Sequence, residues 1–158
     1  MEDQLRQLEL PATPQTDGKL ASAEPASLAE AVSQAGILIV EDEPGMRNFL
    51  EKSLRPRCSF LDVSADTAEA SQLLDQRNYD VILLDNVMPG KSGVEWLAEQ
   101  QRIGLFCDAI LMTAYADLDT AIAAIRAGAS DLLIKPFRSN QVMNAIASEV
   151  PPAAIVYP

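Results

Sequence analysis

Chemically active side chains directly follow four short apolar runs in this 158-residue chain, at Glu41-Asp42-Glu43, Asp85, Thr113 and Lys135. Short apolar runs bounded by turn formers predict buried strands. When such strands are parallel, the groups at their carboxyl ends meet at one edge of the sheet, where ligands bind. Carboxylates gathered there repel one another and raise one another's pKa unless a cation joins them. Oxygen ligands without histidine or cysteine favour a hard ion, for which Mg²⁺ is the best candidate.

Phosphoryl transfer is the chemistry that this set of groups favours. An aspartate such as Asp85 accepts a phosphoryl group well beside Mg²⁺, because positioning and charge neutralisation supply most of that catalysis. Lys135 adds a mobile positive charge, and Thr113 adds a hydroxyl donor. Each group alone also has a purely structural explanation, since acidic residues after a strand stabilise the start of the next helix. Their joint occurrence at four strand ends favours the functional interpretation.

The spacing of apolar residues predicts five strands and five helices in strict alternation. The strands are expected at residues 37–40, 58–63, 81–84, 107–112 and 132–134. Between and after them, apolar residues recur at helical spacing, with Pro44 and Ser92 at predicted starts and Gly128 at a predicted end. Parallel neighbours need such crossover helices, so the fold class is α/β, with helices on both faces of an open parallel sheet.

Composition narrows the choice of partners. The formal net charge of -11 argues against a surface that binds nucleic acid. The chain contains no histidine, which excludes histidine-ligated metals and a histidine general base. No apolar run approaches the roughly 20 residues of a membrane helix, and the N-terminus lacks a signal-peptide pattern. We therefore expect a cytoplasmic protein that neither enters a membrane nor binds nucleic acid directly.

The two ends of the chain differ from its middle. Residues 1–35 are proline-punctuated and polar, and we interpret them as a mostly disordered leader. Within it, Ser27-Leu28-Ala29-Glu30 fits a capping box that can start a short helix through Gln34. Residues 36–150 form the predicted domain, and residues 151–158 are a short apolar tail or the start of a linker.

Five motifs together make the chain similar to the receiver domain of bacterial two-component response regulators. They are Val40-Glu41-Asp42-Glu43, Leu84-Asp85-Asn86-Val87-Met88-Pro89, Met112-Thr113-Ala114, Ala127-Gly128-Ala129 and Ile134-Lys135-Pro136-Phe137. The resemblance covers about residues 36–149. It implies a flavodoxin-like (CheY-like) fold, with a five-stranded parallel sheet in the order 2-1-3-4-5.

The same resemblance assigns roles to the strand-end residues. It implies that Asp85 takes a phosphoryl group from the phosphohistidine of a sensor histidine kinase or a phosphotransfer protein. The implied ligands of Mg²⁺ are Asp42, Asp85, the backbone carbonyl of Val87 and, through a water molecule, Glu41. The implied contacts of the phosphoryl oxygens are Thr113 and Lys135. Such a chain is not a conventional enzyme, since it catalyses only its own phosphorylation and dephosphorylation.

Three positions bear on how the phosphorylated state is sensed and how long it lasts. The family usually carries an aromatic residue at the position of Leu132, where it swings inward on activation; here Tyr115 is the candidate replacement. Val87 and Tyr115 should border the path of the hydrolytic water. Because Val87 cannot hydrogen-bond a water and Tyr115 is bulky, we expect slow self-dephosphorylation.

Residues 111–121 and 125–129 resemble the receivers of NtrC-type regulators, which drive sigma-54 transcription. On the family's pattern, the fourth helix, fifth strand and fifth helix carry the signal to partners or to a second copy. The charges on that face could pair across a symmetric dimer, and they belong to Asp119, Arg126, Asp131 and Arg138. The chain is either a receiver from a longer regulator or a stand-alone receiver that acts as a phosphorelay intermediate or an interaction module.

Three other functions fit the sequence less well. A phosphohydrolase of the haloacid dehalogenase type also uses an aspartyl nucleophile, but it needs an acid at the position of Val87. A flavodoxin-like binding module needs a phosphate loop where Glu41-Asp42-Glu43 would repel phosphate. A degenerate receiver, used only as an interaction surface, would not need the complete set of acids with Thr113 and Lys135.

Overall fold

The computed structural model describes residues 28–105 and 107–150. Five parallel strands form one sheet in the order β2-β1-β3-β4-β5, which confirms the flavodoxin-like arrangement. The strands are β1 (Gly36–Val40), β2 (Phe60–Ser64), β3 (Val81–Asp85), β4 (Asp108–Thr113) and β5 (Asp131–Ile134). The strand β3 lies at the centre of the sheet, between β1 and β4.

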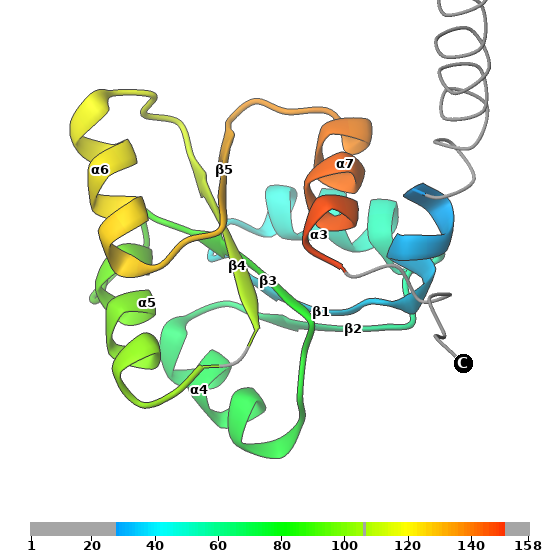
Figure 1. Cartoon of the computed structure of the whole chain (residues 1–158), viewed down its shortest axis with the longest axis horizontal. Coiled ribbons are helices and arrows are strands. Elements are labelled where there is room, and N and C mark those ends of the chain that lie inside the picture. Colours follow the sequence, from blue (N-terminus) through cyan, green and yellow to red (C-terminus); the bar gives the residue numbers. More distant parts are fainter. Residues whose placement is uncertain (1–27, 106, 151–158) are drawn as a thin grey trace, which may run out of the picture.

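A helix follows each strand, and the helices cover both faces of the sheet (Figure 1). They are α3 (Pro44–Leu54), α4 (Thr67–Gln76), α5 (Gly93–Arg102), α6 (Leu118–Ala127) and α7 (Ser139–Glu149). The helices α3 and α7 share one face, while α4, α5 and α6 lie on the other.

The continuous apolar runs of the central strands follow from this layering, because each strand faces a core on both sides. In β3, Val81 and Leu83 enter the core beneath α3 and α7. The alternate residues Ile82 and Leu84 enter the core beneath α4, α5 and α6. All four side chains are fully buried, so the strand shows no polar alternation.

Local capping fixes where most helices begin. The N-cap side chains of α4, α5 and α6 each accept a backbone N–H from the first turn, and they are Asp66, Ser92 and Asp117. The helix α6 ends at Gly128, whose φ of 96° is a left-handed conformation that favours glycine. The helix α3 differs, since its N-cap Glu43 makes no side-chain capping bond and Pro44 opens the helix.

Each of the five strands differs from its predicted range by one or two residues at one or both ends. The second strand begins at Phe60 rather than at Cys58, because the N–H of Cys58 donates to the carbonyl of Leu54 in a turn after α3. The fourth strand ends at Thr113 rather than before it. Thr113 therefore belongs to the sheet itself and is held by the strand ladder.

The apolar residues of α6 do not all face the core. The buried residues of this helix are Ala124 and Ala127. Its larger aliphatic side chains lie outside: Leu118 and Ile125 are each 73% exposed, and Ile122 is 37% exposed. We call Leu118, Ile122 and Ile125 the α6 stripe, since positions spaced by four and three residues share one face of a helix.

The predicted short helix before β1 is present at residues 28–34. Val32 and Ala35 are fully buried in the core beneath α3 and α7, although they precede the predicted domain boundary at residue 36. The remainder of the predicted leader, including Ser27, and the tail at residues 151–158 lie outside the described residues. Among the described helices, none has the length and apolar character needed to span a membrane.

Candidate functional site

Parallel pairing brings the first two groups together. The strands β1 and β3 pair with Val40 opposite Leu84, so the next residues, Glu41 and Asp85, lie side by side at the carboxyl edge of the sheet. Both are buried, with residue exposures of 0% and 4%. Charged groups are rarely buried to this extent unless they are paired, so this edge requires a local counter-charge.

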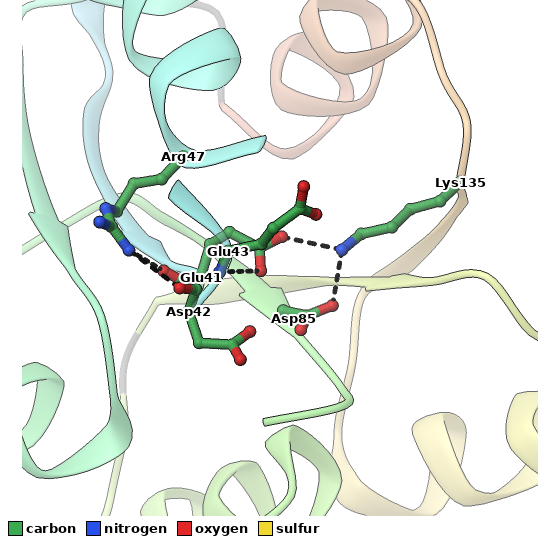
Figure 2. Close-up of polar contacts among 6 residues, drawn as sticks. All are labelled: Glu41, Asp42, Glu43, Arg47, Asp85 and Lys135. Carbon is green, nitrogen blue, oxygen red and sulfur yellow. Dashed lines mark hydrogen bonds and ion pairs between the residues drawn. The ribbon is translucent and has the colours of Figure 1, made fainter. Parts of the chain in front are cut away.

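Lys135 supplies that counter-charge. It follows β5, and its backbone N–H donates to the carbonyl of Thr113 at 2.8 Å. Its ammonium Nζ donates to Glu41 Oε1 at 2.8 Å and to Asp85 Oδ1 at 2.9 Å, as Figure 2 shows. The peptide bond between Lys135 and Pro136 is cis. One lysine thus bridges two buried carboxylates that come from different strands.

A third carboxylate, that of Asp42, completes an oxygen cluster. Carboxylate oxygens of Glu41, Asp42 and Asp85 all lie within 4.8 Å of one another. Ligands of octahedral Mg²⁺ lie about 2.1 Å from the ion and hence about 3 to 4 Å from one another. The spacing and the all-oxygen chemistry therefore fit this ion. We call Glu41, Asp42, Asp85 and Lys135 the acid edge.

Burial and pairing shift the ionisation of the acid edge. Burial raises the pKa of the Glu41 and Asp85 carboxyls, and the hydrogen bond from Lys135 opposes this in both. Burial lowers the pKa of the Lys135 ammonium, but the hydrogen bonds and charges of Glu41 and Asp85 outweigh it, so that its pKa is raised. The charged form of Lys135 is therefore favoured, whereas burial disfavours the charged forms of the two carboxyls.

The acid edge opens into a cavity of about 310 Å³. Its lining combines three groups of residues from the ends of β1, β3 and β4 with the lysine after β5: Glu41, Asp42, Glu43, Asp85, Val87, Ala114, Tyr115 and Lys135. Val87 and Tyr115 are 59% and 61% exposed, and together with Ala114 they form the uncharged part of the lining. A small anionic group can therefore approach Asp85 from solvent past Val87 and Tyr115.

Thr113 and Leu132 lie differently from the groups that line the cavity. Thr113 is 1% exposed, and its Oγ1 accepts the backbone N–H of Tyr115 at 3.1 Å. The hydroxyl proton of Thr113 remains available for a further acceptor. Leu132 lies in β5 and lines a separate cavity of about 250 Å³ between α6 and β5. No aromatic side chain occupies that position.

Three residues that support the site were missed by the sequence prediction. The Oδ1 and backbone O of Asn86 accept the N–H groups of Val94 and Gly93, at 3.1 and 2.9 Å, which fastens the β3–α5 loop. A Cβ on Gly93 would lie 2.3 Å from the carbonyl oxygen of Asp85, so only glycine fits there. The third is Arg47, which donates to the backbone of the acidic triplet (Figure 2). In the sequence, the one signal for these three residues was Gly93, a glycine directly after the N-cap Ser92.

The sequence is similar to known regulators over the same region. TcrA, a transcriptional regulatory protein of Mycobacterium tuberculosis, is 34% identical over 111 residues, which are 70% of this chain and 44% of TcrA. The regulatory protein AtoC of Escherichia coli is 37% identical over 101 residues, which are 64% of this chain and 22% of AtoC. This chain therefore spans less than half the length of either relative.

A solved structure and a family model agree with these relatives. The response regulator protein TrrA of Thermotoga maritima, solved in complex with Mg²⁺-BeF, is 28% identical, with a TM-score of 0.65. The match covers 73% of this chain and 98% of TrrA. The model of the response regulator receiver domain matches residues 37–147, which include every residue of the acid edge. The chain belongs to the family of response regulator receiver domains.

Proposed function

We propose that this domain accepts a phosphoryl group on Asp85, with Mg²⁺, from a sensor histidine kinase or a phosphotransfer protein. One observation carries the proposal: Asp85 ends the central strand, and its buried carboxylate is held by Lys135 and adjoins the carboxylates of Glu41 and Asp42. A lone structural aspartate at a strand end would need neither a lysine partner nor two neighbouring acids.

The reaction follows from this placement. A carboxylate oxygen of Asp85 attacks phosphorus, and an O–P bond forms while the N–P bond to the donor's histidine breaks. The electron pair of that bond remains on the imidazole nitrogen. Lys135 is placed to exchange its contact with Asp85 for a phosphoryl oxygen, and the Thr113 hydroxyl can donate its proton to another. The domain is the acceptor rather than an enzyme acting on a separate substrate.

The residues that would hold Mg²⁺ are Asp42, Asp85 and the backbone carbonyl of Val87, with Glu41 acting through a water molecule. When bound, the ion neutralises charge on the transferring phosphoryl oxygens. The structure of TrrA with Mg²⁺-BeF supports this proposal by similarity. The raised pKa of Glu41 and Asp85 supports it physically, because a cation would stabilise their ionised forms.

The output surface is proposed to be the face formed by α6, β5 and α7, with a second copy or an output domain as partner. Asp119, Arg126, Asp131 and Arg138 are all exposed on these elements and on the loop before α7. The α6 stripe adds apolar area beside these charges. A role in transcriptional control is supported by the name of TcrA, which is itself a transcriptional regulatory protein.

Incubation with a small phosphodonor, with and without Mg²⁺, followed by intact mass measurement, tests the proposal. The expected product carries one phosphoryl group per chain and forms only with Mg²⁺. Glu43→Gln is the matched control, since this residue lines the cavity but lies outside the oxygen cluster, and it should be labelled normally. A folded wild-type chain that takes up no phosphoryl group with Mg²⁺ would contradict the proposal.

A further inference from the structure

We propose that Arg47 is a positioning residue for the Mg²⁺ site, an inference that rests on the proposed function. Its guanidinium holds the backbone of the loop from β1 to α3, the segment that carries Glu41 and Asp42. Arg47 is half-buried and belongs to the first turns of α3, not to a strand end. It acts through the loop and has no contact of its own with the oxygen cluster among the contacts described.

The contacts of Arg47 converge on three successive residues. Its Nη1 donates to the carbonyl oxygen of Glu41 at 2.9 Å and to that of Asp42 at 3.2 Å (Figure 2). Its backbone N–H donates to the carbonyl of Glu43 at 3.0 Å. The side chain of Arg47 thereby binds the carbonyls of Glu41 and Asp42, while its backbone makes the ordinary first helical bond to Glu43. Fixing these carbonyls also fixes the Cα positions from which the carboxylates of Glu41 and Asp42 extend.

The loop from β1 to α3 depends on Arg47 because α3 has no side-chain N-cap. The helices α4, α5 and α6 are capped by side chains, whereas the N-cap Glu43 of α3 makes no capping bond. The N–H of Glu43 donates instead to Glu41 Oε2 at 3.2 Å. Since Glu41 is fully buried, its carbonyl would lose a hydrogen bond in a region with little water if Arg47 were removed.

Electrostatics alone predicts the opposite effect, which makes the inference testable by its sign. A guanidinium near a cation site repels the cation, so removing its charge should tighten Mg²⁺ binding. If Arg47 instead holds the ligand loop in place, removing it should weaken binding. Residues that orient metal ligands change metal affinity by about 10- to 100-fold when mutated, which exceeds a screened charge effect at a half-exposed position.

The experiment measures the Mg²⁺ dissociation constant by calorimetry in wild type, Arg47→Met and Arg47→Lys. We expect Arg47→Met to bind Mg²⁺ about tenfold more weakly. Arg47→Lys should recover part of the loss, because an ammonium can still donate to the carbonyls. At saturating Mg²⁺ the phosphorylation rate should return to the wild-type value, since the loop affects loading and not the chemistry. Equal or tighter binding by Arg47→Met would overturn the inference.

Arg55→Met is the matched control. Arg55 directly follows the last residue of α3, and its Nη1 also donates to a backbone carbonyl, that of Leu61 at 3.2 Å. The control loses the same charge, a similar hydrogen bond and an exposed ion pair with Glu51 at the far end of the helix. Its Mg²⁺ affinity should nevertheless stay at the wild-type value. A weakening equal to that of Arg47→Met would show a general effect of helix destabilisation and would also overturn the inference.

Two outcomes separate this inference from the proposed function. If the wild-type chain does not bind Mg²⁺, the proposed function fails first. If wild type binds Mg²⁺ and Arg47→Met binds it equally well, only the role of Arg47 fails.

Should Arg47→Met be unfolded at working temperature, Arg47→Gln replaces it, because glutamine removes the charge and the long donor with less apolar change. Arg47→Gln binding as tightly as wild type would then decide against the inference.

Discussion

The acid edge buries carboxyl side chains, whereas the α6 stripe exposes aliphatic ones. Each region therefore departs from the usual placement of polar groups outside and apolar groups inside. At the acid edge, the ionisable side chains of Glu41 and Asp85 are buried. On α6, Leu118 and Ile125 are large aliphatic residues that remain 73% exposed. Both placements are costly in an isolated domain, because burying charge loses hydration and exposing aliphatic surface forgoes the hydrophobic effect.

The difference between the two regions lies in what compensates the cost. The acid edge is compensated internally, by the two hydrogen bonds that Lys135 donates. The α6 stripe has no such compensation within the described part of the chain, where its side chains lie open to solvent. The first region is therefore suited to exchange one counter-charge for another. The second is suited to be covered by a partner.

Removing the Lys135 ammonium should have the largest effect on the stability of the domain. Lys135→Met leaves Glu41 and Asp85 buried without a counter-charge, which should reduce the free energy of unfolding by about 3 kcal/mol without Mg²⁺. Urea denaturation in EDTA measures this. Lys91→Met is the control: Lys91 pairs with the exposed Glu99, and its loss should cost at most about 1 kcal/mol. Equal losses in both variants would mean that the acid edge is not specially dependent on its lysine.

A cation should stabilise the acid edge by binding only the folded state. At a Mg²⁺ concentration ten times its dissociation constant, the gain is about 1.4 kcal/mol, visible as a higher melting temperature. Asp42→Ala should abolish this gain and stabilise the Mg²⁺-free protein slightly by relieving repulsion. Glu43→Ala should keep it, since Glu43 lies outside the oxygen cluster. A Mg²⁺ response that survives in Asp42→Ala would overturn the proposed ligand set.

The uncharged border of the cavity should set how long the phosphoryl group lasts. Val87→Asn with Tyr115→Glu introduces groups that can orient a water molecule behind phosphorus. We expect dephosphorylation about tenfold faster, which is less than the roughly 100-fold or more that a fully positioned proton-transfer group contributes, with little change in Mg²⁺ affinity. The decay is followed by intact mass after the phosphodonor is removed. Decay at the wild-type rate in the double variant would refute this account of the lifetime.

The smallest effect on the folded domain is expected at the α6 stripe. Ile125→Ser should change the free energy of unfolding by less than about 0.5 kcal/mol, because the side chain is largely exposed. It should weaken the self-association that we expect phosphorylation to strengthen. Ile103→Ser is the control, since Ile103 is 79% exposed but follows α5. Sedimentation of the phosphorylated chain compares the two, and equal effects would argue against a dimer through α6.

Much of the fold could be predicted because its signals are local. The apolar run at residues 81–84 identified the central strand, and strict alternation identified the parallel sheet. The strand-end rule then brought Glu41, Asp85 and Lys135 together, as the structure shows. These residues are detectable in sequence because each directly follows a recognisable strand.

The remainder depends on contacts that local patterns do not encode. The helical spacing of Leu118, Ile122 and Ile125 is the same for a buried stripe as for an exposed one. The exposure of these side chains is therefore visible only in the structure. Arg47 looks like any arginine on a helix surface until its bonds to the acidic loop are visible. Val32 lies in the stretch that we interpreted as a leader, and its packing against the core places it in the domain.

The identity of the phosphoryl acceptor tests the account most directly. Wild type and Asp85→Asn are incubated side by side with a small phosphodonor and Mg²⁺, and the label is located by intact mass and peptide mapping. We expect one phosphoryl group on the peptide containing Asp85 in wild type. We expect none on Asp85→Asn, which should remain folded by circular dichroism. Label that persists in folded Asp85→Asn, or that maps to Glu41 or Asp42 in wild type, would show that Asp85 is not the acceptor.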